Sequence, residues 1–90
     1  MEWHADVDIV TDLYPSQVDD IVAALESDVV AHHDPGRQLL RLDHRLRAAH
    51  HGTAIAEAGN WVTGEVLPII RRQGRTGPVL RLTVAARSEH

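Results

Sequence analysis

Apolar and polar side chains alternate along one stretch near the start of the chain, Trp3-His4-Ala5-Asp6-Val7-Asp8-Ile9-Val10. In an extended backbone, the odd-numbered positions 3–9 lie on one side and the even-numbered positions 4–8 on the other. This period of two predicts a β-strand with one apolar face and one face of His and Asp. The fold must therefore bury one face of this strand and leave the other in water.

The pattern changes to a helical period in the residues that follow. Ser16 stands three residues before Asp19, as in a capping box, and apolar side chains then recur at helical spacing. These apolar residues are Val18, Ile21, Val22 and Leu25. We expect a first amphipathic helix over residues 16–26, with Asp19 and Asp20 in its first turn, near the positive end of the helix dipole.

A second helix is expected over residues 48–73. Its apolar stripe consists of Ile55, Ala58, Val62, Val66, Ile69 and Ile70. Gly59, Gly64 and Pro68 weaken the pattern. Pro68 is expected to kink or end the helix, because its ring lacks an N–H and crowds the carbonyl of residue 64. A break at residues 59–60 would instead leave residues 61–70 free to pair as an extra strand.

Three further stretches are expected to be strands. Residues 28–33 are rich in β-formers and precede Asp34-Pro35-Gly36, which is a strong turn sequence. In residues 40–47 and 79–87, apolar side chains alternate with polar ones. The two strands around the turn indicate a hairpin, with a loop longer than two residues because Pro-Gly fits a two-residue loop poorly.

The resulting element order is β-α-β-β-α-β within 90 residues. Strands with one apolar face and helices with one apolar stripe pack most simply as two helices on one face of a four-stranded antiparallel sheet. This is the ferredoxin-like sandwich of the α+β class, in which the first and third strands are central. We expect one such domain over residues 1–90. Because many unrelated functions use this fold, it indicates none by itself.

Composition excludes several classes of protein. An apolar fraction of 43% is too high for a disordered chain, and the absence of cysteine excludes disulfides, thiolate metal sites and cysteine nucleophiles. No apolar run approaches the roughly 20 residues of a membrane span, and the start of the sequence lacks the features of a signal peptide. We therefore expect a cytoplasmic protein with no membrane partner.

Charge is distributed unevenly along the chain. Residues 1–34 contain nine acids and no Arg or Lys, whereas residues 35–90 contain nine arginines and four acids. In the expected sheet, acids of the first strand lie between arginines of the third and fourth strands, on the face that the helices leave open. The candidate interface residues are Asp6, Asp8, Arg41, Arg45 and Arg81. Such a face is either a solvated surface or a docking surface, and we expect a homodimer or a protein partner.

The seven histidines show no spacing that is typical of a metal site. Adjacent histidines on a strand or a helix point in different directions, and there is no HExxH motif, so we expect no metal and no cofactor. His44 and Trp61 are candidates to line a small-ligand pocket between sheet and helices. His50 and His51, at the start of the second helix, are candidates to hold an anion, with Thr53 as the helix cap.

Catalysis and nucleic-acid binding find little support in the sequence. No nucleophile with an adjacent base is visible, and arginines near Asp6 and Asp8 should lower the pKa of both carboxyls, which opposes a general-acid role. Proteins of this fold that bind single-stranded nucleic acid present aromatic rings on the open sheet, where His, Asp, Arg and Thr are expected here. The preferred hypothesis is a non-catalytic interaction module. The alternatives are a small-ligand binder or enzyme with a pocket near His44 and Trp61, and a weak nucleic-acid binder.

Overall fold

The computed structural model describes residues 2–25, 29–75 and 77–86. The four strands are β1 (Glu2–Val10), β2 (Val29–Asp34), β3 (Leu39–Arg47) and β4 (Val79–Ala86). Helix α1 (Pro15–Ala24) connects β1 to β2. Between β3 and β4, three helical pieces follow one another directly: α2 (His51–Trp61), the π-helical turn η1 (Val62–Val66) and α3 (Leu67–Arg72).

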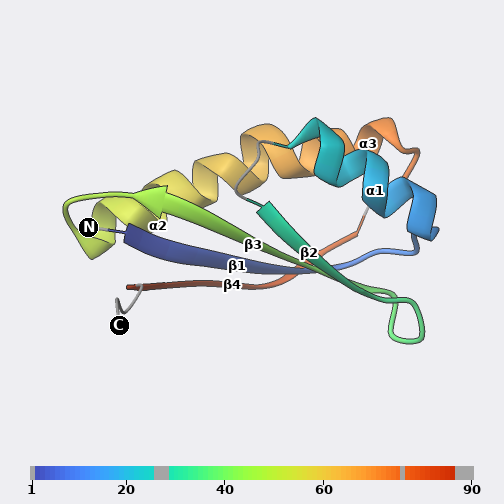
Figure 1. Ribbon diagram of the computed structural model, residues 1–90, viewed down its shortest axis with the longest axis horizontal. Coiled ribbons are helices and arrows are strands. Elements are labelled where there is room, and N and C mark those ends of the chain that lie inside the picture. The colour runs from blue at the N-terminus through green and yellow to red at the C-terminus, as the bar shows by residue number, and fades with distance from the viewer. Residues whose placement is uncertain (1, 26–28, 76, 87–90) are drawn as a thin grey trace.

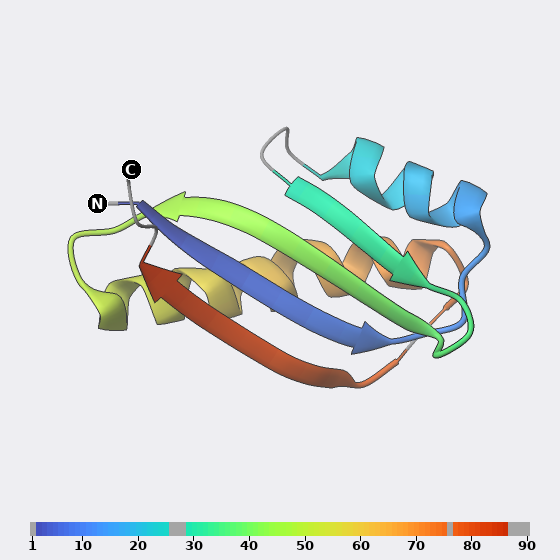
Figure 2. The ribbon, with the colours of Figure 1, turned by 60° about the horizontal axis from the view of Figure 1, so that its bottom comes forward.

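The strands form one antiparallel sheet in the order β2-β3-β1-β4, so β1 and β3 are central, as the sequence predicts. Figure 1 shows α1 and the long helical segment on the same side of this sheet. Figure 2 shows the four strands side by side. The predicted α+β class, with helices on one face of a four-stranded antiparallel sheet, is therefore confirmed. The described residues leave the other face of the sheet open.

The core lies between the sheet and the helices. The apolar face of β1 is buried as predicted, since Trp3, Ala5, Val7 and Ile9 are at most 7% exposed. These side chains pack in two clusters with residues of β3 and the helices, among them Ile21 of α1. Burying one large aliphatic side chain stabilises the fold by about 1.5–3 kcal/mol. A slip of one residue in the strand pairing would turn this whole set toward solvent, so burial fixes the register.

Helix α1 begins earlier than predicted and has a different cap. Its N-cap is Tyr14, and the backbone N–H of Tyr14 donates to Oε1 of Gln17 at 2.9 Å. Ser16 lies inside the first turn and is not the cap, and no acidic side chain lies in that turn. The reason is Pro15, which suits the first helical position because an N–H there has no helical partner to lose. Residue 26 of the predicted range lies outside the described residues.

The helical segment continues through Pro68, so this proline does not end it, and the α-helical hydrogen-bond pattern changes just before it. In the π turn before Pro68, the N–H of Leu67 donates to the carbonyl of Val62, five residues back. The wider turn shifts the hydrogen-bond ladder by one residue at the position where an α-helix would press a carbonyl against the proline ring. Residues 61–70 are therefore helical and do not form the alternative extra strand.

The buried stripe of this segment also differs from the predicted one at its start. Ile55 is 47% exposed, and Ala54 takes the buried position in its place. The later positions of the stripe, from Ala58 to Ile70, are buried as predicted. Thr53 does not cap α2, because the N-cap is His50.

The two outer strands differ in how well they match the prediction. The loop between β2 and β3 spans residues 35–38, which confirms a turn longer than two residues. On β4, Leu80 is 66% and Leu82 36% exposed, although the alternation predicts both on the buried side. The pairing of β1 with β4 shifts register after Asp8, and Leu80 falls at this irregularity. Residue 87 of the predicted strand lies outside the described residues.

Candidate functional site

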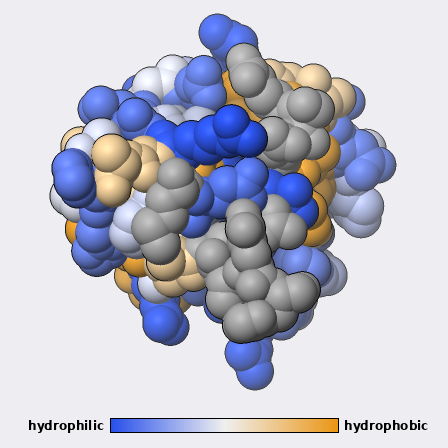
Figure 3. Space-filling view, turned by 60° about the vertical axis from the view of Figure 1, so that its left-hand side comes forward, coloured by the Kyte–Doolittle hydropathy of each residue, from blue (hydrophilic) through white to orange (hydrophobic). Residues whose placement is uncertain are grey.

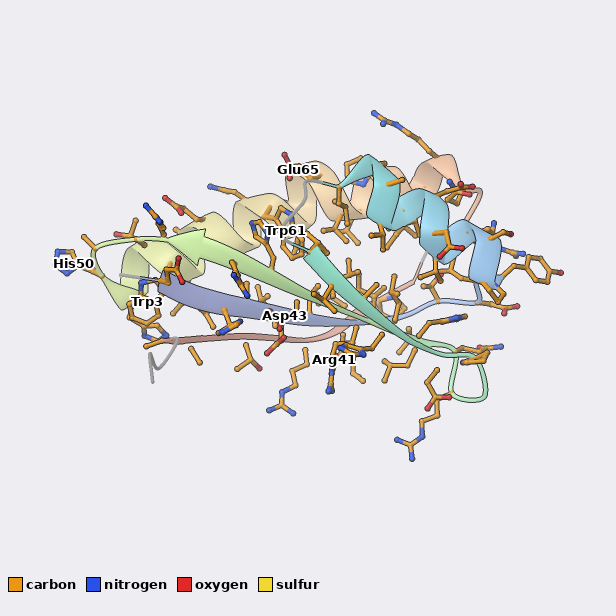
Figure 4. The ribbon with its side chains drawn as sticks, in the orientation of Figure 1. Trp3, Arg41, Asp43, His50, Trp61 and Glu65 are labelled. Atoms are coloured by element: carbon orange, nitrogen blue, oxygen red, sulfur yellow. The ribbon has the colours of Figure 1, made fainter. Side chains whose placement is uncertain are left out.

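The open face of the sheet carries polar side chains in rows that cross the strands. The pairing of β1 with β3 and β4 gives three such rows: His4 with Arg45 and Ala85, Asp6 with Asp43 and Thr83, and Asp8 with Arg41 and Arg81. We call His4 and Arg45 the basic row, and Asp6 and Asp43 the acidic row. Figure 4 shows Arg41 and Asp43 on the side of the sheet away from the helices. Successive rows are about 7 Å apart, because they are two residues apart along each strand.

Asp8 is held in a two-point ion pair with Arg41. Nε of Arg41 donates to Oδ1 of Asp8 at 2.7 Å, and Nη2 donates to Oδ2 at 3.0 Å. Although it lies on the open face, Asp8 is only 6% exposed. The hydrogen bonds from Arg41 lower the pKa of Asp8 against the opposing effect of burial, and Asp8 raises the pKa of Arg41 in turn. The pair is therefore a fixed, charged element of the face.

Asp6 has the opposite surroundings. Asp43 lies directly across from it in the pairing of β1 with β3, and Nδ1 of His4 lies 3.1 Å from Oδ1 of Asp43. Burial raises the pKa of Asp6 and the charge of Asp43 raises it further, while His4 and Arg41 lower it by less. The prediction that the pKa of Asp6 is lowered was wrong: Arg41 does lower it, but burial first and the charge of Asp43 second raise it by more. Two carboxylates thus share the acidic row.

Two arginines next to these carboxylates form no ion pair within the described residues. Arg45 is exposed, and it makes no hydrogen bond there either. Arg81 lies across from Asp8, and its Nε donates to Oγ1 of Thr83 at 3.2 Å. A shallow hollow of about 160 Å³ is lined by Asp6, Asp8, Arg41, Arg81 and Thr83. The face therefore combines two facing carboxylates, of which Asp43 contacts His4, with guanidinium groups that are available to a partner.

The five candidate interface residues lie on one face, as the alternation of the strands predicts. They are Asp6, Asp8, Arg41, Arg45 and Arg81. Three functional positions were missed: His4, Asp43 and Thr83. The alternation places all three on the same face as the candidates, so that signal was present in the sequence. The pairing of Asp6 with Asp43 depends on the register between β1 and β3, which no turn connects, because α1 and β2 lie between them in the chain.

His44 and Trp61 meet inside the protein. Their rings stack with centroids 4.5 Å apart and an angle of 16° between the planes. Trp61 belongs to the main core cluster, and Figure 4 shows it between the helical segment and the sheet. The two candidates therefore pack against each other, and a ligand pocket beside them stays a hypothesis.

His50 and His51 stand at the start of α2, where they have different surroundings. The side chain of His50 makes no capping hydrogen bond. In Figure 4 it points outward, at the end of the molecule where α2 begins. His51 stacks on Trp3 with centroids 5.2 Å apart, and its Nε2 lies 3.1 Å from the carbonyl oxygen of Val84. Hydrophilic side chains gather on this end of the molecule, shown in blue in Figure 3. His51 thus connects α2 to β1 and β4.

Among residues 2–25, 29–75 and 77–86, no group of three or more His, Asp or Glu side chains is placed to hold a metal ion. None of the described helices is both long and apolar enough to span a membrane. No protein-family model, curated protein or solved structure matches the chain. The geometry of the open face is therefore the basis for a functional proposal.

Proposed function

We propose that this protein is an interaction module that pairs with a second copy of itself through the open face of its sheet. The observation that carries the proposal is the set of unmatched charges on that face. Asp6 and Asp43 face each other, while Arg45 and Arg81 form no ion pair within the described residues. A second copy supplies the missing partner for both kinds of charge. The order β2-β3-β1-β4, with the helices on one side, supports the ferredoxin-like assignment.

Symmetry explains why one face can hold both signs of charge. In a two-fold dimer the same patch meets itself, so every group and its complement must lie on one surface. Like charges brought together across an interface are costly, so alternating charges permit few orientations. The Asp8–Arg41 ion pair adds charged groups whose positions on the face are fixed by two hydrogen bonds. The absence of cysteine is compatible with a reducing compartment, and we propose the cytoplasm.

Sedimentation velocity at tens of micromolar protein tests this proposal. Arg45→Glu reverses a charge beside the acidic row, and Arg37→Glu makes the same change in the exposed hairpin loop. We expect the unaltered chain and Arg37→Glu to sediment as dimers, and Arg45→Glu as a monomer with an unchanged far-UV circular dichroism spectrum. A monomeric unaltered chain contradicts the proposal.

A third variant separates the open face from the exposed edge of the sheet. Leu80→Glu places a charge on the apolar edge strand β4, away from the charged rows. We expect Leu80→Glu to remain dimeric. A dimer that survives Arg45→Glu but is lost in Leu80→Glu assigns the interface to the edge and overturns the proposal.

A further inference from the structure

The basic and acidic rows are neighbours on the open face and have opposite charge. We infer that they are the complementary halves of one contact, in which Arg45 of one copy lies against the partner's Asp43 and Asp6. This inference rests on the proposed self-association. A two-fold axis that runs across the strands, midway between the two rows, places the basic row of each copy over the acidic row of the other. Each basic row then faces an acidic row, and the contact occurs twice.

The dimensions of the face permit this contact. Because such an axis runs across the strands, β3 of one copy lies over β3 of the other, which brings Arg45 above the partner's Asp43 and His4 above the partner's Asp6. Sheets that pack face to face are about 10 Å apart, a gap that an arginine side chain bridges. Arg45 is exposed and is not engaged in a hydrogen bond within the described residues, so it is available to reach across.

The rows on either side of the basic and acidic rows have a smaller effect on how two copies dock. Glu2 and Arg47 form an ion pair at 3.8 Å beyond the basic row, and Asp8 and Arg41 form theirs beyond the acidic row. Each of these pairs is close to neutral, while Arg81 adds a positive charge to the row of Asp8 and Arg41. With the midway axis this row faces Glu2 and Arg47 of the partner, so the strongest opposition of charge is that between the two central rows.

An axis through the acidic row would bring like charges together, because it places Asp6 and Asp43 against the same two carboxylates of the partner. The single chain already holds these carboxylates opposite each other, and the charge of Asp43 contributes to the raised pKa of Asp6. A second pair of carboxylates would increase this repulsion. The midway axis is the position that relieves it.

Mixing two charge-reversed variants tests the contact. Arg45→Glu makes both rows of one chain acidic, and Asp43→Arg makes both rows of another chain neutral or basic. Alone, each variant brings like charges together and is expected to be monomeric. In an equimolar mixture, the altered basic row of the first faces the altered acidic row of the second, so native mass spectrometry should detect the heterodimer. We expect its association constant to exceed the self-association constant of either variant by at least about tenfold.

The outcomes separate this inference from the proposed function. If the unaltered chain dimerises and Arg45→Glu is monomeric, but the mixture gives no heterodimer, the pairing of these rows is wrong while the open face remains the interface. If the unaltered chain is monomeric, the proposed function fails and the inference fails with it. Arg37→Glu mixed with Asp43→Arg is the charge-matched control, and it should show no gain over Arg37→Glu alone.

Discussion

Asp6 and Asp8 stand two residues apart on the same face of β1, and their carboxylates have opposite surroundings. Asp8 accepts two hydrogen bonds from Arg41, whereas Asp6 faces Asp43. The pKa of Asp8 is lowered, chiefly by the hydrogen bonds from Arg41, and that of Asp6 is raised, chiefly by burial. An ionised aspartate therefore stabilises the fold at position 8 and destabilises it at position 6.

Asn substitution at position 6 should stabilise the single chain. A raised pKa means that the folded chain binds the proton more tightly than the unfolded chain, so ionised Asp6 destabilises the fold at neutral pH. Asp6→Asn should raise the free energy of unfolding by about 0.5 kcal/mol. The gain should shrink as the pH falls through the raised pKa, because the unaltered carboxyl then becomes neutral as well. Thermal unfolding at high dilution, followed by tryptophan fluorescence, measures the effect.

Asp8→Asn is the matched control, and its expected effect has the opposite sign. The stabilisation from ionised Asp8 is present above the unfolded pKa and is lost as the pH falls through the lowered folded pKa. Loss of the two charged hydrogen bonds from Arg41 should reduce the free energy of unfolding by about 1–2 kcal/mol at neutral pH. Equal effects of the two substitutions would show that the surroundings of the two carboxylates do not differ in solution.

Gly77 allows the chain entering β4 to lie against the end of β1. A Cβ atom at this position would overlap the carbonyl oxygen of Val10, whose N–H donates to the carbonyl of Pro78 at 3.1 Å. Gly77→Ala should therefore reduce the free energy of unfolding by about 1–3 kcal/mol. Gly59→Ala is the control: no atom lies within 4 Å of the added methyl group, and alanine should stabilise α2 by about 0.5–1 kcal/mol. Urea denaturation of both variants measures the two effects.

Among the elements, the strands were predicted more closely than the helices. β1 and β3 each begin one residue before the predicted start, because burial of alternate side chains determines both the sequence pattern and the pairing. The start of α1 also lies one residue before the predicted one, but its cap was wrong, because Pro15 and Gln17 determine the first turn and neither is part of the apolar period. The burial of β4 was overestimated, because alternation does not show whether a helix covers an edge strand.

The spacing of the apolar residues favours the π turn. The buried residues of the long helical segment include a run in steps of four, at positions 54, 58, 62, 66 and 70, together with Trp61 and Ile69. On an α-helix each step of four overshoots a full turn by about 40°, so the stripe would drift by about 160° over the segment. A wider π turn compensates part of this drift and keeps the apolar side on the sheet. A run in steps of four that contains a proline therefore favours a π turn.

Gln17 connects the start of α1 to the residue that follows α3. Its Oε1 accepts the N–H of Tyr14, and its Nε2 donates to the carbonyl of Gln73 at 3.2 Å, just after α3. Gln17→Ala removes both hydrogen bonds and should reduce the free energy of unfolding by about 1–2 kcal/mol. Asp20→Ala, at an exposed position of the same helix, should change it by less than about 0.5 kcal/mol. Similar losses in the two variants would mean that the Gln17 contacts contribute nothing.

For the molecule as a whole, the composition of the open face could be predicted and its pairing could not. Alternation alone places Asp6, Asp8, Arg41, Arg45 and Arg81 on one side. Which of them touch depends on the registers of β1 with β3 and with β4, and none of these pairs of strands is joined by a turn in the chain. The register of β1 with β3 puts Asp43 opposite Asp6 and produces the unmatched charges from which the function is proposed.

Self-association through these charges should weaken in acid. The groups that face Asp6 within one chain are His4 and Asp8 on β1, Arg41, Asp43 and Arg45 on β3, and Arg81 on β4. A partner's arginine favours ionised Asp6, so its pKa is lower in the dimer than in the single chain. Association is therefore full above the single-chain pKa and is lost as the pH falls through the pKa in the dimer.

The pH dependence of self-association tests the role of the acidic row. Sedimentation between about pH 7 and pH 4 should show a falling association constant with an intact circular dichroism spectrum. Asp6→Asn should flatten this dependence. A folded dimer whose association constant does not change over this range contradicts the role of the acidic row.

The most direct test of the account is the protection of a thiol on the open face. The chain contains no cysteine, so Ala85→Cys, opposite His4, and Ala56→Cys, on the exposed side of α2, each introduce a single reporter. As protein concentration rises through the dimerisation range, maleimide labelling of Ala85→Cys should slow several-fold while that of Ala56→Cys stays constant. Labelling of Ala85→Cys at a constant rate, in protein that sediments as a dimer, would show that the open face is not the interface.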